Sequence, residues 1–199
     1  MLSCTCRRAH NFYTIHSFIS PTKSARRIPD ARAEACTAVK AWCFHTQITE
    51  LTDLARKFPD TRIVLNHFGG PLGVGPYTGK QDDIFEVWKV DVADLAGCHN
   101  VHAKLGGINM EINGFGWQDQ ERPPNSGKLI EATRRFYDHA ISCFGVDRCM
   151  FESNFPVDKV SCSYNTLWNS FKRLTNDFSV DERAALFYDS ANRFYRLGL

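Results

Sequence analysis

The sequence predicts an α/β fold in which short parallel strands alternate with helices. Short, unbroken apolar runs recur along the chain, and between them apolar residues return at the spacing of a helix. Strands separated by helices pair in parallel, and such strands are buried on both faces, which suits their continuous apolar character. The predicted order from about Val39 to the C-terminus is therefore β-α-β-α-β-α-β-α-α.

Each predicted strand ends at a polar residue or a glycine. The strands are expected at residues 39–44, 63–65, 101–105 and 148–151. The helices are expected along the apolar stripes from Leu51 to Phe58, Ile84 to Leu95, Ile130 to Ile141, Tyr164 to Leu174 and Ala184 to Phe194. Ser179 and Glu182 have the spacing of a capping box, which predicts the start of the last helix.

Length, charge and hydropathy narrow the class of protein. A chain of 199 residues suits one domain with or without a tail, and a net charge of +2 argues against a nucleic-acid partner. No apolar run approaches the ~20 residues that span a bilayer, so no membrane is expected. A small-molecule substrate is the expected partner.

The N-terminal region differs from the rest of the chain. Residues 1–29 carry five basic residues and no acid, so residues 1–37 are expected to be an irregular basic segment preceding a domain at 38–199. Such a segment is typical of an organelle transit peptide, which makes mitochondrial targeting the alternative to a cytoplasmic protein. The eight cysteines lie mostly in apolar segments and are expected to be free thiols in a reducing compartment.

Polar side chains gather just beyond the ends of the predicted strands. In parallel α/β folds this edge of the sheet is where ligands bind. The residues concerned are His45 and Gln47, Asn66 and His67, Lys104, and Glu152 to Asn154. Four strands delivering polar groups to one rim indicate a binding or catalytic site.

Each of these residues also has a structural interpretation. His67 stands before two glycines that allow close approach of a ligand, which favours a metal ligand or a base over a loop hydrogen bond. His45 is balanced between the two roles, and Asn154 is equally suited to bracing the turn before a proline. Lys104 either binds a carboxylate or reaches solvent, and Asp158 is expected to be an exposed loop acid. His99, His102 and His139 are expected to be structural or exposed.

Four segments together resemble a known family. They are WCFHTQ at 42–47, FPDTRIVLNHFGGP at 58–71, NVHAKLGG at 100–107 and RCMFESNFP at 148–156. In combination they are similar to the amidohydrolase-related family of metal-dependent TIM-barrel hydrolases, which includes sugar lactonases and pyrone-dicarboxylate hydrolase. The resemblance runs from about residue 38 to the C-terminus.

The resemblance implies a partial (β/α)₈ barrel holding strands five to eight with their flanking helices. His67 then occupies the sixth-strand histidine position and His45 lies near the fifth-strand position, which implies that both bind a divalent metal, with zinc as the expected ion. Asn154 falls where most members carry a metal-binding aspartate, so His67 and Asn154 are the expected catalytic residues. Gln47, Lys104 and Glu152 are expected to bind the substrate.

Two departures from the family pattern bear on activity. An amide at Asn154 cannot accept a proton from water and is a poor ligand for a divalent ion, so Glu152 or Asp158 would have to substitute. Strands one to four, with the H-x-H ligands of the first strand, are absent. The expected function is water attack on a lactone or amide carbonyl by a hydrolase that is truncated and impaired; the alternatives are a non-catalytic assembly module and a decarboxylase.

A partial barrel also predicts an exposed sheet face. Four parallel strands cannot close on themselves, so the face that would point into the barrel is left open. That face is expected to be apolar and to carry Ile63, Val64, Leu65, Val101, Leu105 and Phe151. The chain is therefore expected to associate into a homo-oligomer through this face.

Overall fold

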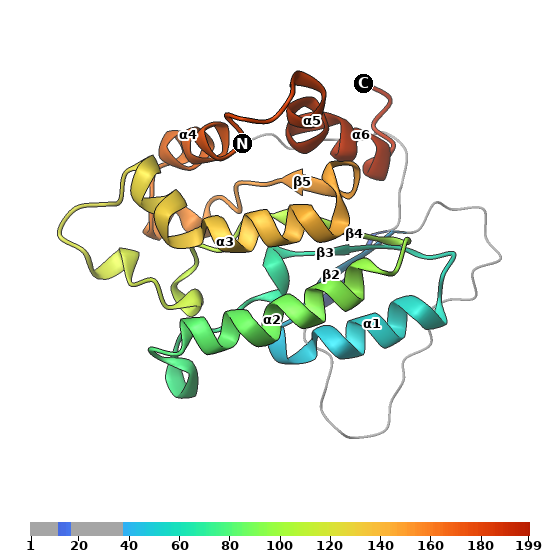
Figure 1. Cartoon of the computed structure of the whole chain (residues 1–199), viewed down its shortest axis with the longest axis horizontal. Coiled ribbons are helices and arrows are strands. Elements are labelled where there is room, and N and C mark those ends of the chain that lie inside the picture. The colour runs from blue at the N-terminus through green and yellow to red at the C-terminus, as the bar shows by residue number, and fades with distance from the viewer. Residues whose placement is uncertain (1–11, 17–37) are drawn as a thin grey trace.

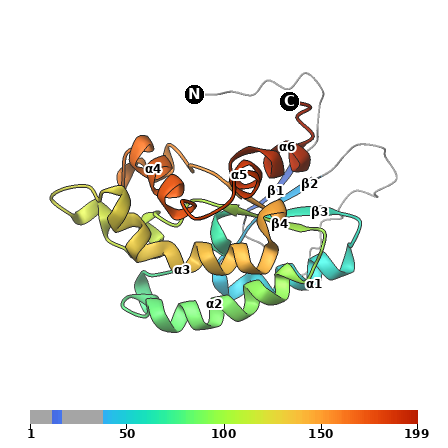
Figure 2. The same ribbon diagram turned by 45° about the horizontal axis from the view of Figure 1, so that its top comes forward.

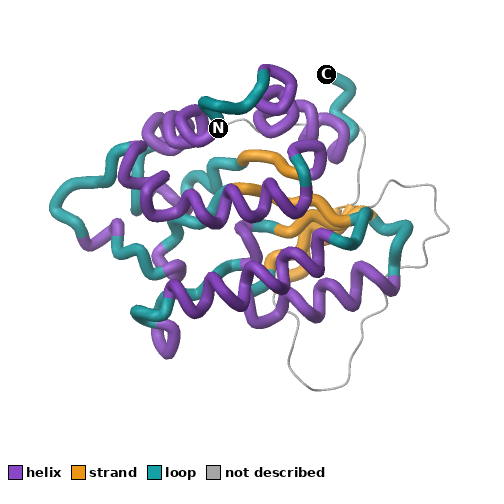
Figure 3. Tube along the Cα trace, in the orientation of Figure 1, coloured by secondary structure: helices purple, strands orange, loops and turns teal. Residues whose placement is uncertain are grey.

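The computed structural model describes residues 12–16 and 38–199, and it contains one parallel sheet. The strands lie side by side in the order of the sequence (Figure 1; Figure 3). They are β1 (Phe12–His16), β2 (Ala38–Trp42), β3 (Arg62–Leu65), β4 (Val101–Leu105) and β5 (Cys149–Phe151). The predicted α/β fold with parallel strands is confirmed, and the arrangement is that of a partial barrel.

A helix follows each of the strands β2 to β5, as predicted. The helices are α1 (Ile48–Lys57), α2 (Gln81–Ala96), α3 (Ser126–Phe144), α4 (Tyr164–Leu174), α5 (Val180–Ala184) and α6 (Ser190–Tyr195). Helices α1 to α4 contact one another in sequence order. Helices α4, α5 and α6 lie along the top of the molecule, and α1 and α2 lie at the bottom (Figure 1; Figure 2). The capping box at Ser179 and Glu182 is confirmed. The last predicted helix is interrupted by a π-helical turn at Ala185–Asp189.

One expectation about the N-terminal region is wrong. Residues 1–37 were predicted to be irregular, yet Phe12–His16 form β1, which pairs in parallel with β2. The register sets Phe12 opposite Ala38 and His16 opposite Trp42, so β1 covers the edge of β2. The remaining residues of the segment, with the basic cluster and the candidate transit peptide, lie outside the described residues.

The two faces of the sheet differ in polarity. Ile63, Leu65, Val101, Leu105 and Phe151 all belong to the core under the helices. The expectation that these residues form an open apolar face is therefore wrong, because successive residues of a strand point to opposite sides and these share the covered side.

The opposite face of the sheet carries both charged and apolar residues. The register aligns Lys40 with Val64 and Lys104 with Met150, so these four residues share that face. Phe194 of α6 covers part of it by packing on Ala38, Val64 and Met150. The remainder, around Lys104, lies at the carboxyl end of the sheet beside the loops that carry the candidate site.

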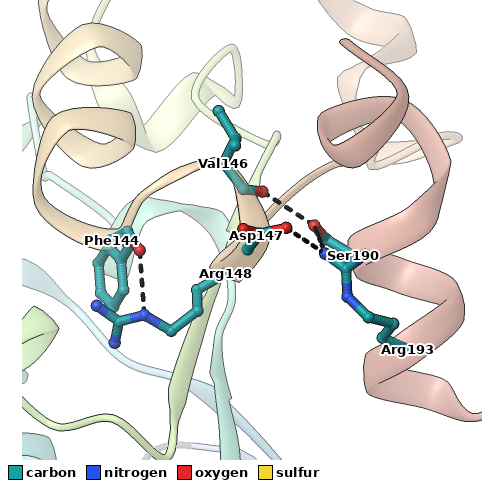
Figure 4. A network of polar contacts seen from close by, with 6 residues as sticks. All are labelled: Phe144, Val146, Asp147, Arg148, Ser190 and Arg193. Carbon is teal, nitrogen blue, oxygen red and sulfur yellow. Dashed lines mark hydrogen bonds and ion pairs between the residues drawn. The ribbon is translucent and has the colours of Figure 1, made fainter. Parts of the chain in front are cut away.

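Polar contacts fix α6 to the turn that leads into β5 (Figure 4). Ser190 Oγ donates to the carbonyl of Val146 at 2.9 Å, and the Arg193 guanidinium donates to Asp147 at 2.6 Å. In the same turn, Arg148 Nε donates to the last carbonyl of α3 at 3.0 Å. Helix α6, which covers part of this face, is thus attached to the start of β5, the strand that ends just before Glu152.

Two further expectations concern the described residues as a group. Cys43, Cys98, Cys143, Cys149 and Cys162 are all free thiols, as predicted for these five. Within the described part of the chain, no helix is both long and apolar enough to cross a membrane.

Candidate active site at the carboxyl ends of the strands

His67 lies in a strained turn directly after β3. Its backbone φ is 53°, and that of Phe68 is 57°, a left-handed conformation that residues other than glycine seldom adopt. The indole N–H of Trp88 donates to the Phe68 carbonyl at 2.6 Å in the buried core, which holds the turn in place. Backbone strain that the surrounding packing maintains is concentrated at functional sites, so the turn marks His67 as a functional candidate.

A glycine after β4 lets the backbone approach the His67 ring. A Cβ atom added to Gly107 would lie 2.5 Å from His67 Nδ1, and the φ of Gly107 is 77°. Any other residue at this position would displace the imidazole. The glycines that the sequence singled out after β4 therefore serve the histidine that follows β3.

Glu152 joins His67 to Lys104. Its Oε1 lies 2.8 Å from His67 Nδ1, and its Oε2 lies 2.9 Å from Lys104 Nζ. The side chains are only 17–18% exposed, so the group is mostly shielded from water. The His67 ring N–H is not aligned with the carboxylate as a strong hydrogen bond requires, a feature common in active sites without substrate.

The charges of this group stabilise one another. Burial alone would raise the pKa of Glu152, but contact with His67 and the positive charge of Lys104 together bring that pKa below its ordinary value. Burial alone would lower the pKa of Lys104, but Glu152 and Tyr195 raise it. Glu152 is therefore a carboxylate and Lys104 an ammonium ion at neutral pH. The predicted substrate-binding residues Lys104 and Glu152 bind each other.

Asn154 and Asp158 form a second polar pair beside this group. Asn154 has a φ of 52°, and its Nδ2 donates to Asp158 Oδ1 at 2.7 Å. Asp158 is fully buried, so the expectation of an exposed loop acid is wrong. Burial raises the pKa of Asp158 to about 6, against the lowering effects of Asn154 and His67, while the charge of Glu152 raises it further. Asn154 follows Glu152 by two residues, so the Asn154–Asp158 pair adjoins the contact of Glu152 with His67.

His45 and Gln47 hold loops in place. His45 is 4% exposed, its Nδ1 accepts from the Leu72 N–H at 3.2 Å, and its ring meets Tyr77 edge-on. Burial lowers the pKa of His45, which keeps the ring neutral for that acceptor role. Gln47 Oε1 accepts from the Phe44 N–H at 3.1 Å. The expected roles of His45 in metal binding and Gln47 in substrate binding gain no support from these contacts.

The described residues do not fit a divalent metal ion. In residues 12–16 and 38–199 there is no group of three or more His, Cys, Asp or Glu side chains arranged to hold one. His67 Nδ1 faces Glu152, and Glu152 already carries the Lys104 ammonium, which would repel a second cation. Asn154 adds only a neutral amide.

Parallel strands that present polar groups at their carboxyl ends, with helices packed outside them, are typical of TIM barrels. The sequence model of the amidohydrolase family matches residues 11–197, and the chain belongs to that family. The family expected from the sequence is thereby confirmed, and the match begins just before β1.

Known relatives are considerably longer than this chain. The uncharacterized protein y4mH of Sinorhizobium fredii is 42% identical over 77% of this chain and 45% of its own length. An L-fucono-1,5-lactonase of Burkholderia ambifaria is 27% identical over 74% of this chain and 46% of its own length. The chain thus spans about half the length of the curated relatives it matches.

Solved structures show the same partial overlap. A crystal structure of an amidohydrolase from Burkholderia multivorans with bound HEPES superposes with a TM-score of 0.70 at 25% identity, covering 81% of this chain and 53% of that one. A second crystal form of an amidohydrolase from that organism, with bound zinc, gives a TM-score of 0.69 at 25% identity over the same shares. The similarity confirms the partial TIM-barrel fold.

Proposed function

We propose that this protein hydrolyses the ring ester bond of a small-molecule lactone, with His67 as the general base. The observation that carries the proposal is the position of Glu152, whose buried carboxylate lies 2.8 Å from His67 Nδ1. A histidine oriented by a carboxylate is the recurring arrangement of a general base in acyl-transfer and hydrolytic sites.

The carboxylate determines which nitrogen of His67 carries the proton. An ionised carboxylate can only accept hydrogen bonds, so its contact with Nδ1 favours the tautomer that holds the hydrogen on Nδ1 and presents the lone pair of Nε2. Lys104 strengthens the effect, because it keeps Glu152 ionised. The negative charge of Glu152 in turn stabilises the imidazolium that forms when Nε2 accepts a proton.

The reaction then follows from ordinary acid–base chemistry. His67 Nε2 removes a proton from water, and the hydroxide attacks the lactone carbonyl to give a tetrahedral intermediate. The ring C–O bond breaks, the ring oxygen takes the proton from the imidazolium, and a hydroxy acid leaves. One water is consumed, and His67 returns to its starting state.

The relatives favour a lactone over an amide. Two L-fucono-1,5-lactonases, at 27% and 26% identity, match about three quarters of this chain. A lactone also has the better leaving group, so its hydrolysis needs less catalytic assistance beyond one general base than cleavage of an amide does.

The test is lactone hydrolysis by the whole chain and two single variants. A pH-indicator assay follows L-fucono-1,5-lactone, glucono-1,5-lactone and δ-valerolactone. We expect His67→Ala to reduce kcat/KM by about 10²–10⁴-fold, the usual contribution of a general base. His99→Ala is the matched control, because His99 is exposed and precedes β4 at the opposite edge of the sheet. Turnover that is equal in wild type and H67A, or absent in both, would favour the non-catalytic assembly module.

A further inference from the structure

The amide of Asn154 is held by a fully buried carboxylate four residues away. Asn154 Nδ2 donates to Asp158 Oδ1 at 2.7 Å, and the Asp158 backbone N–H donates to the Asn154 carbonyl at 3.2 Å. Asp158 is 0% exposed, whereas Asn154 is partly exposed. The pair thus links a buried acid to a side chain at the surface of the site.

The chemistry of the pair fixes the orientation of the amide. A carboxylate has no hydrogen to donate, so the NH₂ group of Asn154 must face Asp158 and the planar amide must direct Oδ1 away from it. Among the described residues, no hydrogen bond reaches Asn154 Oδ1, and this atom is not buried. Asn154 therefore presents an accessible hydrogen-bond acceptor.

Asp158 is itself held firmly. The backbone N–H groups of Ser161 and Cys162 donate to its carbonyl at 3.0 and 3.1 Å. Ser161 Oγ donates to the Asn109 carbonyl at 2.5 Å, which ties the loop after β4 to the loop after β5. A buried residue whose backbone is fixed in this way is suited to orienting a neighbour.

The pair lies beside the proposed base. Asn154 follows Glu152 by two residues, and the Glu152 carboxylate lies 2.8 Å from His67 Nδ1. Asn109, which Ser161 binds, follows Gly107 by two residues, and Gly107 lies against the His67 ring, so the pair belongs to the same site. An acceptor at this place attracts hydrogen-bond donors and repels carbonyl and carboxylate oxygens. A hydroxyl group is the donor that the ring of a small lactone commonly carries.

We propose that Asp158 is a positioning residue that holds the Asn154 amide oxygen toward the site, where Asn154 accepts a hydrogen bond from a substrate hydroxyl group. This role rests on the proposed lactone hydrolysis and narrows its substrate to hydroxylated lactones. An ionised Asp158 enforces the orientation, so the selectivity is fully developed above the pH at which this acid loses its proton.

The kinetic test compares two six-membered lactones at pH 8, glucono-1,5-lactone with hydroxyl groups and δ-valerolactone without them. Asp158→Asn keeps the shape of the side chain but lets the Asn154 amide turn over, because the new amide can donate as well as accept. We expect D158N to lower the preference for glucono-1,5-lactone over δ-valerolactone about tenfold through KM, the effect of one misplaced hydrogen bond. Asp138→Asn, on the half-exposed Asp138 of α3, is the matched control.

A double variant separates orientation from simple structural support. In N154D/D158N the amide at position 158 donates to the carboxylate at position 154, whose second oxygen again faces the site. We expect this exchange to restore the preference that D158N loses. Equal loss for both lactones in D158N, or no recovery in the double variant, would overturn the positioning role.

A second measurement does not depend on turnover. In ¹⁵N-labelled protein, the Asn154 side-chain amide should show slow hydrogen exchange in wild type and fast exchange in D158N. If wild type hydrolyses no lactone, the proposed function fails on its own, and this resonance still tests the orientation. Exchange that is equally fast in both proteins would contradict the proposal.

Discussion

Replacing Glu152 with glutamine tests the energetics of the site. The substitution keeps the shape of the side chain and removes the charge that pairs with Lys104 at 2.9 Å and His67 at 2.8 Å. Because the side chains are only 17–18% exposed, Lys104 is left as a nearly buried cation without a counter-ion. Removing one partner of a buried ion pair costs about 3–5 kcal/mol.

The lower end of that range applies here, since the glutamine oxygen still accepts one hydrogen bond from Lys104. We expect E152Q to lose about 3 kcal/mol, which corresponds to a fall in Tm of roughly 6–12 °C for a domain of this size. Glu86→Gln is the matched control, because Glu86 pairs with Lys89 on the surface and its side chain is 62% exposed. Such surface pairs contribute about 0–1 kcal/mol.

The difference in stability between wild type and E152Q should depend on pH in a defined direction. The pKa of Glu152 is lower in the folded protein than its ordinary value of 4.5, so its stabilisation is present above pH 4.5 and is lost as pH falls through the lower folded value. Thermal melting followed by circular dichroism at pH 7 and under acidic conditions measures both effects. A Tm for E152Q equal to that of wild type at pH 7 would refute the account of the ion-pair group.

Three further predictions concern the loops, the metal and the association state. Gly107→Ala should reduce lactone hydrolysis at least tenfold by displacing the His67 ring, whereas Gly79→Ala, with a similar φ of 73° and open space around it, should change stability alone; equal activity of the two variants would contradict the steric argument. The chain by itself should retain well below one zinc per molecule after dialysis, since a neutral histidine and an amide offer little charge to bind the ion; elemental analysis finding close to one zinc would overturn this. The chain should self-associate, because β5 pairs on one side only among the described strands; a monodisperse monomer in sedimentation at low micromolar concentration would count against it.

The sequence was sufficient for most elements of the fold. The strand at 101–105 and the helix at 164–174 have the predicted bounds, and the other predicted strands are displaced by one or two residues at their ends. These segments have strong apolar patterns whose period reports burial directly. Strand β1 was missed because its sequence, FYTIH, lies in a basic segment and forms a strand by pairing with β2.

The site was predicted in part. The sequence identified His67, Glu152, Lys104 and Asn154. In the structure Glu152 contacts both His67 and Lys104, and Asn154 donates to Asp158. Spacing along the sequence does not show which side chains face each other across β4 and β5, so it could not predict the contact of Lys104 with Glu152.

Asp158 was misjudged for a similar reason. A single acid in a loop is usually exposed, and no local pattern reveals that the loop after β4 closes over this one. Side chains alternate between the two faces of a strand, which places His102 on the same face as Lys104. The His102 ring packs against Phe194, as expected of a structural histidine.

The central claim is that Glu152 sets the protonation of His67, and ¹⁵N NMR of the labelled imidazole tests it most directly. At pH 8 the spectrum of wild type should show His67 protonated at Nδ1 and unprotonated at Nε2, and E152Q should lose that preference. A wild-type spectrum with the proton on Nε2, or a tautomer that E152Q leaves unchanged, would contradict the account.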